Sequence, residues 1–188
     1  MSFKSWEIMR FRFVRGFTLI EVMVSIAVLV VLIALAMPSF TDAIKRYHIN
    51  ALRDELISSL QLARSEAMRR GTPIIMVRKT VNCTFNVPDS QDWHCGWHLV
   101  VDSNNNGNAN AAEEIIQNTN IATGYMLGHP HIGSPSQIIA NRWGQFTPLA
   151  NRFVISPTAT GVADPATLTV CVSSGGRIRS VPDDVECI

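Results

Sequence analysis

The chain has 188 residues, of which 47% are hydrophobic, so it is long enough for one folded domain with appendages. Its formal net charge is +1, but residues 1–16 carry four basic side chains and one acidic one, which leaves 12 basic against 14 acidic side chains in the remainder. A remainder with a charge of −2 excludes a general electrostatic attraction to nucleic acid, so any anionic partner must be held by a local patch.

The first predicted element is an apolar helix. Residues 17–37 are apolar apart from Glu21 and two small hydroxyl-bearing residues. A helix of this length is about 30 Å long, which is enough to cross a bilayer. The basic stretch before it would remain in the cytoplasm, so the sequence predicts one membrane span with the rest of the chain outside the cytoplasm. A cleaved secretory signal is the alternative, but the apolar block is long for one and no convincing small-x-small cleavage site follows it.

The start of this helix resembles the processing site of type IV prepilins, with the string Arg-Gly-Phe-Thr-Leu-Ile-Glu at 15–21. The resemblance implies that prepilin peptidase cuts after Gly16, removes the preceding residues as a leader, and leaves Phe17 as the N-methylated first residue. A start at Met9 instead of Met1 would only shorten that leader, 1–16.

An acidic residue in an apolar block is costly and is usually functional. The resemblance implies that Glu21 acts in assembly, by neutralising the terminal ammonium of a neighbouring pilin inside an apolar bundle. Other pilins are therefore expected partners. The protein would lie in the inner membrane with a periplasmic head, and would then enter an extracellular pilus.

Residues 38–70 are predicted to continue the same helix with an amphipathic pattern. Apolar residues recur there at spacings of three or four: Leu52, Leu56, Leu60, Ala63 and Ala67. Charged residues, Arg64 among them, lie off this stripe, and Gly71-Thr72-Pro73 ends the pattern. We expect one helix from about Thr18 to Arg70, with its second half packed on a folded head.

The head, residues 71–188, is predicted to be rich in β-strands. The runs expected to form strands are 74–78, 97–102, 115–118, 145–149, 152–156, 168–172 and 177–181. Clusters of Gly, Pro, Asn and Ser separate them, and 128–136 is expected to be a loop. One long helix against a mostly antiparallel sheet is an α+β arrangement, which agrees with a type IV pilin-like fold.

The four cysteines fall in two close pairs, Cys83 with Cys95 and Cys171 with Cys187. Outside the cytoplasm an even count indicates disulfides. The sequence allows three connectivities, and we prefer the two local pairings because short loops cost the least entropy to close. A zinc site at Cys95, which two histidines flank, is the alternative, but no CxxC spacing supports it. We expect no metal and no cofactor.

Residues 102–113 have the spacing of a calcium loop, with Asp102, Asn104, Asn106 and Glu113 at ligand positions and Gly107 at the position of the turn glycine. Strands rather than helices are expected on both sides, and only two of these positions carry charge, which predicts weak binding. An Asn/Gly-rich hairpin loop is the alternative.

The five histidines raise the question of catalysis, because histidine is the commonest general base. No nucleophile motif, metal-ligand run or phosphate loop accompanies them. We therefore do not expect an enzyme.

The remainder of the chain resembles the FimT/GspH group of minor pilins and pseudopilins. The resembling features are Ala-Arg-Ser-Glu-Ala at 63–67, a strand directly after Pro73, a Trp97 strand leading into the Asn/Gly loop, and Trp-Gly-Gln-Phe at 143–146. The group includes pseudopilins of secretion systems and minor pilins of type IV pili, so membership does not by itself determine function.

The string Gly-Gly-Arg-Ile-Arg at 175–179 resembles the Gly-Arg-x-Arg motif by which FimT-like minor pilins bind DNA in natural transformation. On a strand, Arg177 and Arg179 would lie on one face about 7 Å apart, and guanidinium groups bind phosphate well. Gly176 would let the backbone approach closely. The alternative is that two arginines on an edge strand only keep it soluble.

Further DNA contacts are expected from the other basic residues of the head: Arg78, Lys79, Arg142 and Arg152. Trp143 could stack on bases, although we expect it in the core. The acidic residues that follow the motif would weaken its potential. The resemblance implies a minor type IV pilin that binds DNA without sequence specificity for uptake; the alternative is a structural or priming subunit, or a type II secretion pseudopilin, without DNA binding.

Overall fold

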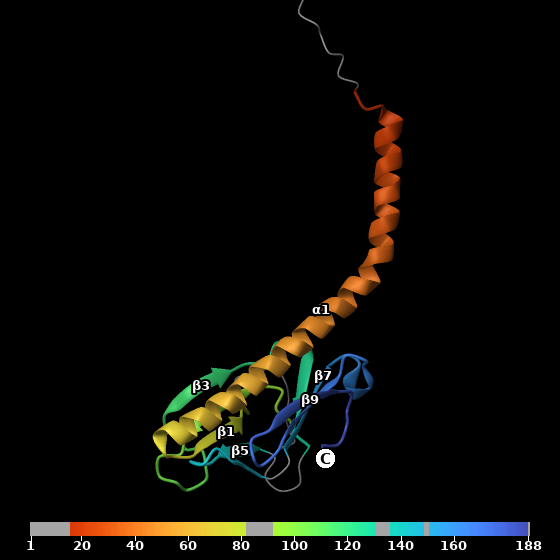
Figure 1. The fold of residues 1–188 in the computed structure, drawn as a ribbon. Coiled ribbons are helices and arrows are strands. Elements are labelled where there is room, and N and C mark those ends of the chain that lie inside the picture. Colours follow the sequence, from red (N-terminus) through yellow and green to blue (C-terminus); the bar gives the residue numbers. More distant parts are fainter. Residues whose placement is uncertain (1–15, 82–91, 131–135, 149–150, 188) are drawn as a thin grey trace, which may run out of the picture. The chain divides into compact units, whose positions relative to one another are not determined.

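The computed structural model describes residues 16–81, 92–130, 136–148 and 151–187, except for the side chains of 35–39 and 151. The chain divides into two compact units, Met1–Asp42 and Ala43–Ile188. Helix α1 (Leu19–Arg70) belongs to both, because it begins in the first unit and ends in the second (Figure 1). The predicted helix from about Thr18 to Arg70 is thus confirmed.

In the first unit, the apolar side chains of helix α1 are exposed. Phe17 is 87% exposed, and the large apolar residues from Leu19 to Ile33 are also open to the surroundings. Within the described residues, no helix contains a stretch that is both long enough and apolar enough to cross a membrane. The membrane span at 17–37 stays a prediction.

In the second unit, helix α1 buries the apolar stripe that the sequence indicates. Leu56, Leu60 and Ala67 are almost completely buried, and Ile49 extends the same row toward the N-terminus. Gly71 ends the helix with a φ of +66°, a left-handed conformation that glycine adopts without strain.

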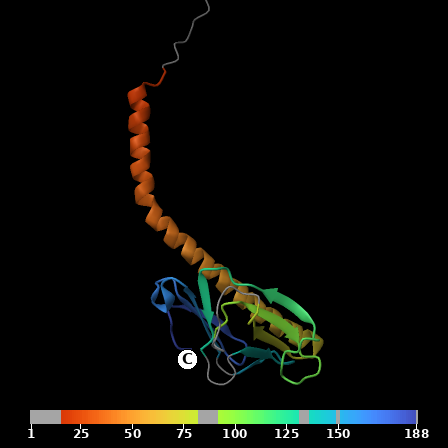
Figure 2. The ribbon, with the colours of Figure 1, turned by 180° about the vertical axis from the view of Figure 1, so that it is seen from behind.

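The head contains two antiparallel sheets rather than the single sheet that we expected. The first has the strand order β3-β2-β1-β5-β6 and the second the order β4-β7-β8-β9. The strands are β1 (Ile74–Arg78), β2 (Trp97–Val101), β3 (Ile115–Thr119), β4 (Tyr125–Gly128), β5 (Gln137–Ala140), β6 (Phe146–Thr147), β7 (Asn151–Pro157), β8 (Leu168–Val172) and β9 (Ile178–Pro182). Seen from behind, the blue strands of the second sheet lie apart from the green strands β2 and β3 (Figure 2).

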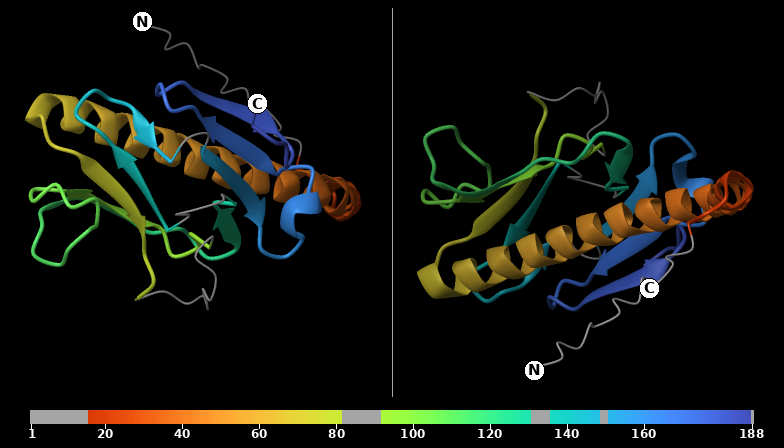
Figure 3. Two further views of the ribbon diagram at one scale, coloured as in Figure 1. Left: turned by 90° about the horizontal axis from the view of Figure 1, so that it is seen from below. Right: turned by 90° about the horizontal axis from the view of Figure 1, so that it is seen from above.

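One hydrophobic core joins the helix to both sheets. Stripe residues pack in it with Met76 and Leu99 of the first sheet and with Phe153 and Val170 of the second. The helix lies in front of the strands in the view from above and behind them in the view from below (Figure 3). All residues of this core lie within 43–188, so the second unit contains its own complete core.

Each strand that we predicted from the sequence is present, with ends that shift by at most two residues. Strands β4 and β5 were missed because they have only four residues each, too few to show a clear alternation. The first residue of the loop expected at 128–136 ends β4, and 131–135 lie outside the described residues.

The central position of the stripe predicts a large difference between two leucines of the same helix. Leu56→Ala removes a side chain with no exposed area, so unfolding of residues 43–188 should become easier by about 2–5 kcal/mol. Leu62→Ala, at a position that is 37% exposed, is the matched control and should cost less than about 1 kcal/mol. Urea unfolding followed by circular dichroism measures both, and equal losses would contradict the packing described above.

Candidate functional site

The N-terminal end of helix α1 is closed by a reciprocal pair of hydrogen bonds between Thr18 and Glu21. The backbone N–H and the hydroxyl of Thr18 each donate to Oε2 of Glu21 at 2.8 Å, and the Glu21 N–H donates back to the Thr18 hydroxyl oxygen at 3.3 Å. This is a capping box, which satisfies N–H groups that the first turn of a helix leaves without partners. Glu21 therefore already has a local structural role within one chain.

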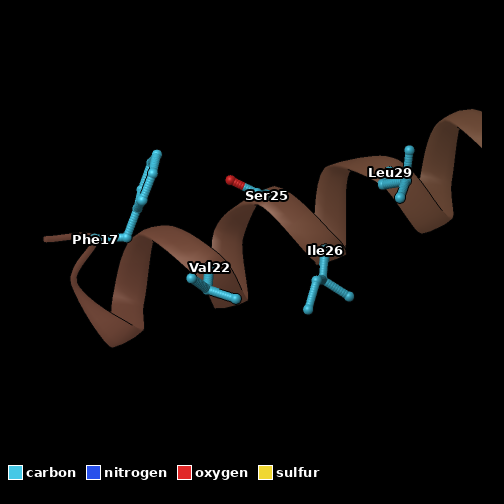
Figure 4. A pocket seen from close by; sticks show the side chains of 5 residues that line it. All are labelled: Phe17, Val22, Ser25, Ile26 and Leu29. Atoms are coloured by element: carbon cyan, nitrogen blue, oxygen red, sulfur yellow. The ribbon is translucent and has the colours of Figure 1, made fainter.

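Beside this cap lies a shallow apolar groove on the exposed helix. Its lining residues are Phe17, Val22, Ser25, Ile26 and Leu29 (Figure 4). The only polar side chain among them, that of Ser25, donates to the backbone oxygen of Glu21 at 2.7 Å. The groove thus presents almost only carbon atoms, as a surface that packs on another apolar surface does.

The second candidate site is the hairpin that joins β8 to β9. Its turn is held by three hydrogen bonds: Ser173 N–H to Arg177 O, Gly176 N–H to Ser173 O, and Arg177 N–H to the hydroxyl oxygen of Ser173, at 2.9, 2.9 and 3.0 Å. Strand β9 begins at Ile178, one residue later than expected, so Arg177 closes the turn instead of opening the strand.

The alternation expected around the motif is present. Ile178 is half-buried and packs against the core, whereas Arg177 and Arg179 on either side of it are exposed. The two guanidinium groups therefore belong to the surface of the head, at the start of one edge strand.

The backbone of this turn packs on Arg64 of helix α1, a residue to which the sequence analysis gave no role. Gly176 has a φ of +83°, and a Cβ at this position would lie 2.4 Å from Nη1 of Arg64. That same Nη1 donates to the backbone oxygen of Gly176 at 3.2 Å. The backbone at Gly176 thus comes close to another group, as we expected of this glycine. That group is the Arg64 guanidinium of the same chain.

A second turn, at residues 141–145, also lies close to Arg64, and to Met68 of the same helix. Gly144 has a φ of +77°, and a Cβ there would lie 2.9 Å from Nε of Arg64. The N–H of Phe146 donates to the backbone oxygen of Ser174 at 2.9 Å, which joins the second turn directly to the hairpin. A single guanidinium therefore lies close to two turns that belong to different sheets.

The second turn carries Trp143 and Arg142. Trp143 is 67% exposed, so the expectation that it lies in the core is wrong. Cζ of Arg142 lies 4.5 Å from the centre of the Trp143 ring, a cation–π arrangement. Arg142 also contributes to a small polar pocket with Thr72 and Ser103. Of the four further basic residues, Arg142 lies on a turn that is joined to the hairpin, and Arg152 lies across strand β8 from Arg179.

The other three have structural partners. Arg78 donates to the backbone oxygen of Asp92 at 3.0 Å. Lys79 is buried and donates to the side-chain oxygens of Asn118 and Asn120. Both lie at the far end of β1 from Ile74, which pairs with Ala140 just before the second turn. They are therefore separated from the motif by the length of a strand.

Arg152 is engaged by the C-terminal tail, 183–187. It pairs with Asp184 at 3.3 Å and donates to the backbone oxygen of Val185 at 3.4 Å. Register places Arg152, Cys171 and Arg179 directly opposite one another, so they share the face of the second sheet that points away from the core. Asp184 is thereby engaged by Arg152.

The tail is held on this face by a disulfide between Cys171 and Cys187, which confirms the second predicted pairing. Thr169 strengthens the attachment, because its hydroxyl donates to the backbone oxygen of Asp183 at 2.7 Å. Cys95 is also disulfide-bonded, which rules out the zinc alternative; its predicted partner, Cys83, lies outside the described residues.

Charge pairing leaves few cations open near the hairpin. Arg69 and Arg70 both bind Glu66, and their hydrogen bonds lower the pKa of that carboxyl to about 2. Among the described residues, no carboxylate lies within ion-pair distance of Arg64, Arg142 or Arg177. The open positive charge of this part of the head is therefore concentrated around the two turns.

The loop at 102–113 is organised by its own hydrogen bonds. The carboxylate of Asp102 accepts from the N–H groups of Asn106 and Gly107 at 3.0 and 2.9 Å, and that of Glu113 accepts from Asn110 N–H at 2.9 Å. The hydrogen bond from the Asn110 N–H lowers the pKa of the Glu113 carboxyl. No cluster of three or more His, Cys, Asp or Glu residues that could hold a metal ion occurs within the described ranges, and the arrangement fits the Asn/Gly-rich loop.

Comparison with known proteins gives two matches to families. Residues 53–181 match the family described as type II transport protein GspH, and residues 12–37 match the prokaryotic N-terminal methylation motif. No curated protein matches the chain significantly.

Solved structures share the fold at low sequence identity. Two crystal structures of the type IV minor pilin FimU from Pseudomonas aeruginosa are 21% identical, with TM-scores of 0.52 and 0.55. They cover 74% and 77% of this chain and 99% and 98% of their own. The minor pseudopilin EpsH from the type 2 secretion system of Vibrio cholerae is 14% identical with a TM-score of 0.50, over 72% of this chain and 97% of its own. These likenesses establish the α+β pilin fold alone.

The contact between Gly176 and Arg64 predicts different effects at two adjacent glycines. Gly176→Ala should destabilise residues 43–188 by about 1–3 kcal/mol, because the new Cβ is both strained at positive φ and too close to Arg64. Gly175→Ala meets no atom within 4 Å and should change stability by less than about 0.5 kcal/mol. Chemical denaturation of the two variants measures this, and an equally tolerated Gly176→Ala would contradict the strained, closely packed conformation described for Gly176.

Proposed function

The chain belongs to the GspH family of minor type IV pilins and pseudopilins, and we propose that this member is a pilus subunit whose head binds DNA for uptake. The observation that carries the proposal is the pair of exposed arginines, Arg177 at the end of a turn fixed by hydrogen bonds and Arg179 in the strand β9 that follows it. Their surroundings add open positive charge from Arg142, and Arg64 supports the turn from behind.

Phosphate is the chemical group that this surface suits. Guanidinium groups keep their charge and offer forked donors to phosphate oxygens, and a strand places alternate residues about 7 Å apart along one face. Nothing in such a pair reads bases, so binding is independent of sequence. The head has a net negative charge outside this patch, so its affinity is low and falls steeply with salt.

Incorporation in a filament compensates for weak binding by a single head. Several copies on one pilus can engage one DNA molecule, which raises the effective affinity without new contacts. The N-terminal methylation motif supports processing after Gly16, and the exposed apolar residues of 17–33 support anchoring in the inner membrane and then packing in the pilus.

DNA binding by residues 43–188 tests the proposal. The double variant Arg177→Gln with Arg179→Gln should lose most binding to a short duplex, and the slope of log K against log salt should fall by about 1.8, about 0.9 for each lost phosphate contact. Fluorescence anisotropy between about 50 and about 200 mM salt measures both quantities.

The matched control removes the same charge elsewhere. Arg46→Gln with Arg53→Gln takes two arginines from helix α1 away from both turns, and should reduce affinity by less than twofold. If the wild-type head does not bind DNA at low salt, the protein is a structural subunit or a secretion pseudopilin. If the two double variants lose equal affinity, the binding is a general effect of charge.

The role of Glu21 in assembly can be separated from its role in the helix cap. Gln at this position still caps the helix but carries no charge, so Glu21→Gln should accumulate in the membrane and fail to enter pili. Thr18→Ala removes the two cap bonds of the Thr18 hydroxyl while keeping the carboxylate, and should still assemble. Immunoblots of membrane and sheared-pilus fractions distinguish the two, and normal piliation by Glu21→Gln would contradict the assembly role.

A further inference from the structure

We propose that Trp143 stacks on a nucleobase, so that the head binds single-stranded DNA more tightly than duplex DNA. The inference rests on the proposed function, because it specifies which form of DNA that same site prefers. Its starting point is the exposure of Trp143, a large aromatic residue that is 67% open to solvent in a head whose tryptophans 93 and 97 are fully buried.

The exposure of Trp143 is built into its turn. Oδ1 of Asn141 accepts hydrogen bonds from the N–H groups of Trp143 and Gln145, both at 3.0 Å, and the N–H of Gly144 donates to the Asn141 backbone oxygen at 2.8 Å. Asn141 in turn donates from its side chain to the Gln145 side-chain oxygen at 3.1 Å. The indole is thus presented by a closed network of bonds, which limits the entropy lost when a ligand orders it.

The position of the indole relative to the hairpin is also fixed. Gly144, next to Trp143, and Gly176, next to Arg177, pack against the same Arg64 guanidinium. The bond from Phe146 to Ser174 ties the two turns together at 2.9 Å. An aromatic face and the phosphate-binding arginines therefore occupy neighbouring turns, within reach of adjacent nucleotides of one strand.

A stacking surface beside arginines is the combination that single-stranded nucleic acid uses. Bases of an unpaired strand can turn onto an aromatic side chain while the phosphates follow the positive groups. In a duplex the base faces are stacked on each other, so the indole has nothing to stack on. Arg142, 4.5 Å from the ring centre, adds a cation beside the stacked base and strengthens the attraction to the strand.

The test compares three probes of equal length, about 12 nucleotides, with the head at residues 43–188. They are a single strand of mixed sequence, a strand of abasic deoxyribose phosphates, and a duplex. The wild type should bind the single strand roughly tenfold more tightly than the abasic strand, because one base stack is worth about that factor. Trp143→Ala should bring the single strand to the level of the abasic one, and Trp143→Phe should keep part of the preference.

The outcomes separate this inference from the proposed function. Equal binding of the single and abasic strands by the wild type, or a preference that survives Trp143→Ala, overturns the stacking role. The proposed function stands in that case if Arg177→Gln with Arg179→Gln still abolishes binding. Failure of the wild type to bind any of the probes at low salt overturns both.

Discussion

The burial of one row of side chains on helix α1 organises the whole head. The row from Ile49 to Ala67 packs with residues of both sheets, and the two sheets have separate strand orders. Because they meet on a common helix, the register of that helix decides which of their turns come together. Arg64 follows Ala63 of the row directly, and this places a charged group where the hairpin and the second turn converge.

The candidate site is consequently a product of close backbone packing. Gly144 and Gly176 each have positive φ and each lie too near Arg64 to carry a side chain. A larger residue at either position would be strained at positive φ and would require the end of the Arg64 side chain to move. The two glycines thus act as positioning residues, whereas the exposed arginines of the motif contact the ligand in the proposed function.

Several cations of residues 43–188 are already paired with carboxylates. Arg69 and Arg70 are neutralised by Glu66, and Arg152 by Asp184 of the tail. The disulfide between Cys171 and Cys187 keeps the acidic tail on the outer face of the second sheet, where it meets Arg152. A head with an overall negative balance can therefore still present a positive patch at its two turns.

The sequence by itself determined the features that depend on local pattern. Helix α1, its buried stripe, most strands and the pairing of Cys171 with Cys187 follow from periodicity, turn residues and short loop closure. Tertiary structure decided the rest. Three features depend on packing between segments far apart in the chain: the partition into two sheets, the exposure of Trp143, and the position of Arg64 close to both turns. An aromatic residue is buried on average, and only the arrangement of its neighbours leaves this one at the surface, since no local pattern encodes which distant turn lies beside it.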